Sequence, residues 1–143
     1  SEVFFLKPNP DITLTSPSSA QIPVTVGGYQ VSDKGLYIDS GRGFTVSSVI
    51  KPDFVAPAVN VQGVGVRDNY VTASGTSVAA AVTAGACAQI MEWGIYRQEN
   101  LALNSVEIGN LLIHGCDRSR DLVYPNTAWG YGRLDAYQAI LAL

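Results

Sequence analysis

Charged residues are scarce in this chain of 143 residues: Asp, Glu, Lys and Arg together make up 15%, where soluble domains have about 25%. Apolar residues make up 47%, and the mean hydropathy is positive. So few charges are unusual for the surface of a self-sufficient domain. We therefore expect an exposed apolar face that normally contacts more protein, either further polypeptide or a second copy of the chain.

Basic residues are few as well. The nine Lys and Arg residues are scattered, the formal net charge is −3, and the isoelectric point is about 4.9. Binding to nucleic-acid phosphates requires a basic stripe or patch. The sequence therefore excludes a nucleic-acid partner.

The chain also lacks the usual signs of disulfides, metal sites and membrane spans. Its two cysteines, Cys87 and Cys116, have no Cys or His at ligand spacing, which predicts two small buried side chains. There is no Asp-rich loop of the calcium-binding kind, and we expect neither a metal nor another cofactor. The longest apolar run, 78–91, contains Thr83 and Gln89 and is shorter than the ~20 residues of a membrane span. It predicts a core helix, and no membrane span is expected.

Periodicity and turn residues predict one incomplete α/β domain over 1–143, since no linker divides the chain. The longest helix, 76–93, has apolar residues on every side, so we expect it to be buried between layers and to stop at Gly94. A helix beginning near Leu134 should place Tyr137, Ile140 and Leu141 on its inner face. The helix at 104–115 should begin with an Asn104–Glu107 capping box. The expected strands are 3–6, 23–26, 35–40, 43–49, 54–56, 59–61 and 70–73.

The segment S-G-T-S-V-A-A-A-V-T-A-G, residues 74–85, is the candidate site. It sets Ser77 at the start of a helix of small residues, where backbone N–H groups can stabilise the negative charge that follows attack by a serine hydroxyl. Gly75 permits a tight turn, and Ser74 or Thr76 can cap the helix. An alternative is a capped, buried helix in which G-T-S has no chemical role.

Five blocks follow one another along the chain: T-V-G-G-Y at 25–29, S-G-R-G at 40–43, K-P-D-F-V-A-P at 51–57, G-T-S at 75–77 and W-G-Y-G-R-L-D-A at 129–136. Together they resemble the subtilisin-like serine peptidases. The resemblance is narrower to the Csp-type spore-germination members, through F-L-K-P-N-P-D-I-T-L, M-E-W-G-I-Y and Y-P-N-T-A-W-G-Y-G. It implies part of a subtilisin-like fold with a parallel sheet, hydrolysis of polypeptide substrates, and Ser77 as nucleophile, with Gly75, Thr76 and Ser77 as backbone support of the oxyanion.

The resemblance also implies what is missing. The triad of this family follows the chain order Asp, His, Ser, so the acid, the base and the oxyanion amide should lie upstream of Ser1. The one histidine, His114, follows Ser77, and we expect it to be structural. Asp53 belongs to the K-P-D block, whose role in the family is structural. We therefore expect the carboxy-terminal part of a serine endopeptidase domain, inactive without the polypeptide that precedes it.

Departures from the family pattern leave a second hypothesis open. Ala81 stands where the family has proline, Ala58 where it has glycine, and Gly41 and Phe44 replace a serine and a proline. If residue 58 needs a positive φ, alanine would strain the loop before Ser77. The alternative is a noncatalytic pseudopeptidase or a binding scaffold with the same fold.

Overall fold

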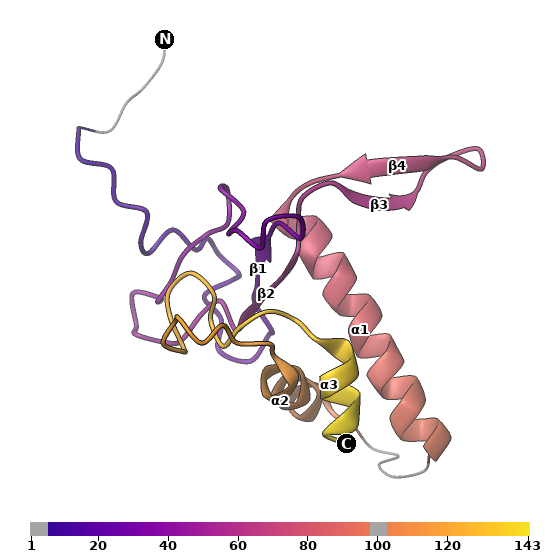
Figure 1. Ribbon diagram of the computed structural model, residues 1–143. Helices are drawn as coiled ribbons and strands as arrows, with labels where there is room; N and C mark the ends of the chain where they lie inside the picture. Colours follow the sequence, from indigo (N-terminus) through magenta and orange to yellow (C-terminus); the bar gives the residue numbers. More distant parts are fainter. Residues whose placement is uncertain (1–5, 98–102) are drawn as a thin grey trace.

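The computed structural model describes residues 6–97 and 103–143, so the strand expected at 3–6 lies almost entirely outside the described residues. Four short strands precede three helices (Figure 1). The strands are β1 (Val26–Tyr29), β2 (Phe54–Pro57), β3 (Val61–Val64) and β4 (Tyr70–Ala73), and the helices are α1 (Thr76–Arg97), α2 (Ser105–Gly115) and α3 (Ala136–Leu141).

Strand β2 is the centre of the fold. It pairs in parallel with β1, with Val26 opposite Phe54. On its other edge, Val55 N donates to Gly132 O at 2.9 Å and Leu134 N donates to Val55 O at 2.8 Å. Because both edges are bonded and both faces are covered, its first three residues are fully buried. The α/β class and the partial parallel sheet are as predicted.

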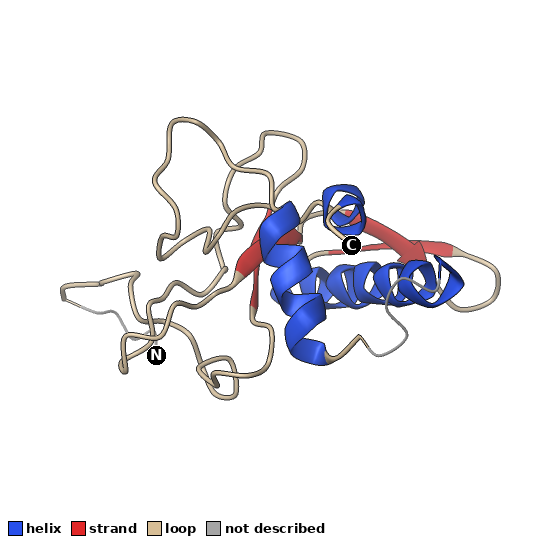
Figure 2. Cartoon of the chain, turned by 90° about the horizontal axis from the view of Figure 1, so that it is seen from below, coloured by secondary structure: helices blue, strands red, loops and turns tan. Residues whose placement is uncertain are grey.

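The helices pack together on the side of β2 and form the core with it. Helix α1 contacts β1, β2 and α3, and α2 packs on α3. In Figure 2 the three helices gather at one end of the molecule and the long loops at the other. The larger buried cluster consists of Phe54, Ala86, Ile90, Ile108, Leu112, Cys116 and Ala139, and a smaller one consists of Ala56, Ala58 and Ala79.

Helix α1 corrects two expectations. It passes through Gly94 and ends at Arg97, and it is not buried all round. Its buried residues recur at helical spacing along one face, while the opposite face, with Ala81, Ala84 and Ala88, is exposed. Burial needs a covering layer, and the described residues supply one on a single side. The exposed apolar face predicted from composition is thus present.

Helix α1 is longer than its apolar run 78–91, which weakens the argument that this run is too short for a membrane span. Thr76–Tyr96 is long and apolar enough, by length and composition, to cross a membrane, and 28% of that window is buried in the structure. Core helices of soluble proteins also meet this test. The contacts of α1 with both parallel strands are those of a core helix.

The second helix begins as expected. Asn104 Oδ1 accepts hydrogen bonds from Val106 N and Glu107 N at 3.0 Å each, and Glu107 Oε2 accepts from Asn104 N at 2.9 Å. This reciprocal capping box satisfies helix N–H groups and the cap N–H that would otherwise be unpaired. Helix α2 ends at Gly115, the predicted stop.

The third helix differs from its prediction. It starts two residues later, at Ala136, because the Asp135 carboxylate accepts from Gln138 N at 3.0 Å and caps it. Ala139 is its buried residue and Ile140 is partly buried. Tyr137 and Leu141 are 67% and 62% exposed, so the expected inner face was wrong for these two.

Two expected strands are loops, and two others are displaced. In 35–40 only Leu36 makes a bridge, to Tyr29, and 43–49 forms a turn in which Val49 N donates to Thr45 Oγ1 at 2.9 Å. Alternating β-branched residues cannot form a strand without a partner. Strand β1 starts at Val26 rather than residue 23, and β3 starts at Val61 rather than residue 59.

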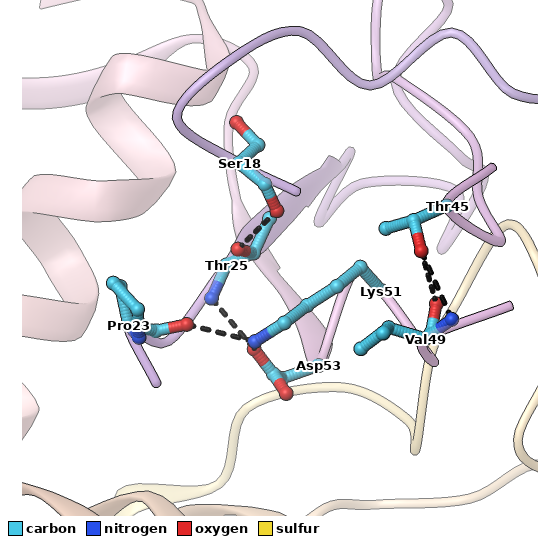
Figure 3. A network of polar contacts seen from close by, with 7 residues as sticks. All are labelled: Ser18, Pro23, Thr25, Thr45, Val49, Lys51 and Asp53. Carbon is cyan, nitrogen blue, oxygen red and sulfur yellow. Dashed lines mark hydrogen bonds and ion pairs between the residues drawn. The ribbon is translucent and has the colours of Figure 1, made fainter. Parts of the chain in front are cut away.

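The K-P-D block has the structural role that the resemblance implies. Lys51 Nζ donates to Asp53 Oδ2 and to Pro23 O, both at 2.7 Å, and Asp53 Oδ2 also accepts from Thr25 N at 2.6 Å (Figure 3). The Lys51 and Asp53 side chains are 3% and 13% exposed. Thr25 Oγ1 extends the network to Ser18 O at 2.8 Å. This network joins the residues just before β1 to the residues just before β2.

We predict that Lys51→Met destabilises the protein by about 3–5 kcal/mol, because it leaves the Asp53 carboxylate buried without its cation. The measurement is the free energy of unfolding in guanidinium chloride. The control is Asp117→Asn, which removes the other ion pair, that of Arg133 with the 55% exposed Asp117; it should cost less than about 1 kcal/mol. Equal losses in the two variants would contradict the assignment.

Both cysteines are free thiols that pack as apolar side chains. Cys116 is 6% exposed, and its Sγ donates to Leu112 O at 3.2 Å. Burial raises the pKa of the Cys116 thiol to about 12 and raises that of the half-buried Cys87 thiol as well. A thiol that stays protonated is a poor nucleophile.

We predict that Cys116 resists alkylation by iodoacetamide at pH 9 in the folded protein and reacts at once in denaturant, as followed by mass spectrometry. Its pKa is raised from 9.0 to about 12 on folding. The stabilising effect of the neutral thiol is therefore complete below pH 9 and is lost as the pH rises toward 12. Equal alkylation rates in folded and denatured protein would be the opposite result.

Candidate active site

The hairpin β3–β4 leads directly into the candidate nucleophile. Its strands pair antiparallel, with Val61 opposite Ala73, and it projects from the body beside the start of α1 (Figure 1). Two hydrogen bonds close its base: Asn60 N donates to Ser74 Oγ at 2.8 Å, and Gly75 N donates to Ala58 O at 2.8 Å. Of the two residues expected as possible caps, Ser74 uses its hydroxyl to bind Asn60 and Thr76 is the first residue of α1 itself.

Gly75 forms the turn before the helix. Its φ of 151° lies in the region that favours glycine. The Gly75 carbonyl accepts from Val78 N at 3.0 Å and from Ala79 N at 3.3 Å, which starts α1. The turn is therefore specific for glycine, and it fixes the direction in which the next residues leave.

Ser77, the second residue of α1, is exposed at the helix start. In the described part of the chain its hydroxyl has no hydrogen-bond partner, and the backbone N–H groups of Thr76 and Ser77 have no acceptor. Unpaired N–H groups are normal in the first helical turn, where they form an anion-binding site. Gly75, Thr76 and Ser77 thus bring together an accessible hydroxyl and free donors.

The sequence signal for these contacts was incomplete. Asn60 has φ 52°, a conformation in which asparagine is enriched. That preference could have indicated a tight turn at 60, but its partner Ser74 is 14 residues away. A hydrogen bond between such distant positions depends on hairpin register, which the sequence did not give.

Ala58 does not strain the loop before Ser77. Its φ is not positive, and its side chain is fully buried. It packs over Gly28 so closely that a Cβ at residue 28 would lie 2.5 Å from the Ala58 Cβ. Alanine at 58 is thus compatible with the loop that leads to Ser77, provided that residue 28 is glycine.

No general base lies beside Ser77 among the candidates. His114 is exposed in the last turn of α2. Its neighbour Leu112 belongs to the same cluster as Ile90, which lies about 20 Å along α1 from Ser77 at 1.5 Å per residue. Asp53 is engaged by Lys51. A base must come within about 3 Å of the hydroxyl it deprotonates, and neither His114 nor Asp53 is placed to do this for Ser77.

Residues 6–97 and 103–143 contain His, Cys, Asp and Glu side chains that could act as metal ligands. No three His, Cys, Asp or Glu side chains there gather as a ligand set would. None of these residues in that part of the chain therefore defines a metal centre.

Comparison with known proteins places this geometry in a family. The model of the Subtilase family matches residues 6–132. The serine protease AprX of Bacillus subtilis (strain 168) is 30% identical over 148 residues, covering 90% of this chain and 32% of AprX. The CspB protease of Clostridium perfringens superposes with a TM-score of 0.89 at 35% identity, covering 95% of this chain and 30% of that one.

More distant structures share the fold. The prenylagaramide maturation protease PagA superposes with a TM-score of 0.76 at 20% identity, over 94% of this chain and 47% of PagA. The chain spans about a third of the length of AprX and of CspB. The match over residues 6–132 and the likeness to CspB confirm the resemblance drawn from the motifs: this chain belongs to the Subtilase family and has a partial subtilisin-like fold.

Proposed function

We propose that this chain is the carboxy-terminal portion of a subtilisin-like serine endopeptidase domain and that Ser77 is its nucleophile. The observation that carries the proposal is the exposed Ser77 hydroxyl at the start of α1, directly after the Gly75 turn. Ser77 Oγ would attack a peptide carbonyl of a polypeptide substrate. The Ser77 N–H would donate one hydrogen bond to the oxyanion that forms.

The base and its orienting acid would come from polypeptide outside this chain. A serine hydroxyl is not nucleophilic at neutral pH until a base takes its proton. Without the histidine, a peptidase of this kind keeps about 10³–10⁴-fold acceleration over water. Removal of one oxyanion donor lowers the rate by roughly another 10²–10³-fold. The chain by itself is therefore inactive in this proposal.

The exposed face of α1 supports the proposal that the base comes from polypeptide outside this chain. Ser77, Ala81, Ala84 and Ala88 recur at helical spacing, so they lie on one face. A helix of the missing polypeptide that packs on these small residues reaches close to the α1 backbone. Such a helix would also pass beside the Ser77 hydroxyl, where a base is needed. A second copy of this chain could cover the same face but offers only His114 as a histidine.

The competing function is a noncatalytic scaffold, which the substitutions at 41, 44, 58 and 81 favour. Two of them are harmless to the fold. Ala58 fits its site without a positive φ, and Ala81 lies on the exposed face of an unbroken helix. The test of function therefore has to address the reactivity of Ser77.

We predict that a fluorophosphonate labels Ser77 in the full-length protein and that Ser77→Ala abolishes both labelling and peptide cleavage. Only a serine activated by a base reacts with this reagent. The matched control is Ser105→Ala, because Ser105 is another exposed serine at a helix start. It should leave labelling unchanged. Cleavage that persists in Ser77→Ala would overturn the proposal, and a wild-type protein that neither labels nor cleaves would favour the scaffold.

We predict that Ala84→Glu destabilises the full-length protein by more than about 2 kcal/mol, because the charge would be buried under the missing polypeptide. Ala84→Ser at the same site is the control and should cost less than about 1 kcal/mol. Thermal unfolding of both variants measures the difference. If the two variants unfold like the wild type, this face of α1 is exposed to solvent in the whole protein.

A further inference from the structure

A small cavity lies away from Ser77, between the turn that follows β1 and the loop that precedes α3. Its volume is about 280 Å³. The loop side includes part of Y-P-N-T-A-W-G-Y-G, a block that the proposed chemistry does not use. The lining residues are Lys34, Ser119, Leu122, Tyr124, Trp129 and Arg133.

The aromatic walls of this cavity are held in place before any ligand binds. Asn126 Oδ1 accepts from Trp129 N at 2.9 Å, and the Trp129 ring lies against the Tyr29 ring, with centroids 6.4 Å apart. Across the cavity, the Tyr124 hydroxyl accepts from Ser119 N at 3.2 Å. These contacts hold the Trp129 ring and the Tyr124 hydroxyl in position at the cavity.

Two cations face the same space. Arg133 binds Asp117 through Nη2 at 2.5 Å. A guanidinium has five N–H donors, and within the described residues Nε and Nη1 of Arg133 have no partner. The Lys34 ammonium forms no ion pair with any residue of 6–97 or 103–143. The Arg133 side chain is 17% exposed, so its donors act at low solvent exposure.

Neither of the neighbouring carboxylates, Asp33 and Asp117, lines the cavity. Asp117 is 55% exposed and takes up one nitrogen of Arg133. Asp33, next to Lys34 in sequence, accepts from Gly35 N at 2.7 Å through Oδ1. The charged side chains that line the cavity are therefore both cations, Lys34 and Arg133. An apolar, aromatic wall next to such donors suits a ligand with an anionic end and an apolar body.

We propose that this cavity binds a carboxylate attached to an apolar or aromatic group, with Lys34 and Arg133 holding the carboxylate and Trp129 contacting the apolar part. The carboxylate has two sources in a polypeptide, the chain terminus and an acidic side chain. The site is independent of Ser77, since none of its residues belongs to α1 or to the hairpin before it.

The test is a titration of the full-length protein with N-acetyl-phenylalanine and with N-acetyl-phenylalanine amide, followed by ligand-observed NMR. The free acid should bind roughly 10-fold more tightly than the amide, because only the acid forms charge-assisted hydrogen bonds. N-acetyl-glutamate amide is the third probe: it should bind less tightly than the acid if the terminal carboxylate is the source, and more tightly if the side chain is.

The variant that tests the site is Lys34→Gln, whose exposed side chain can be replaced without disturbing the core. It should weaken binding of N-acetyl-phenylalanine roughly 5-fold or more. The control is Lys7→Gln, an exposed lysine outside the cavity, and its dissociation constant should equal that of the wild type. Equal binding of acid and amide, or equal effects of the two lysine variants, would overturn the proposal.

Discussion

The buried ion pair of Lys51 and Asp53 is the interaction on which the rest of the structure depends. It joins the segment before β1, through Pro23 O and Thr25 N, to the residue before β2. Strand β2 then pairs with β1 on one edge and with residues 131–134 on the other. Burial of an ion pair costs desolvation free energy, but it also fixes the geometry of the groups that the pair joins. It aligns three distant segments, and the loop that reaches Ser77 begins at the end of β2.

Local sequence signals predicted local structure well. The capping box of α2 came from Asn104 and Glu107, three residues apart, and the structure forms it. The predicted position of Ser77 at a helix start likewise needed only the glycine turn and the alanines after it. Both predictions succeeded because the groups that interact are neighbours in the chain.

Predictions that depended on distant partners did less well. Segments 35–40 and 43–49 alternate as strands do, but within the described residues the first makes only the isolated bridge of Leu36 to Tyr29 and the second forms a turn. Helix α1 is apolar all round, which predicted complete burial, yet the described residues cover one face only. The hydrogen bond from Asn60 N to Ser74 Oγ was not predicted, for the same reason. The pattern of apolar and β-branched residues indicates what a segment can bury or pair with. Whether a partner is present depends on other parts of the polypeptide.

The two hydrogen bonds at the base of the hairpin separate its tip from Ser77. Both connections into Gly75 are tied down, one through the Ser74 hydroxyl and one through the Ala58 carbonyl. Movement of residues 65–69 therefore has to break these bonds before it reaches the helix start. A change in the length or charge of the tip should therefore leave the position of Ser77 unaltered.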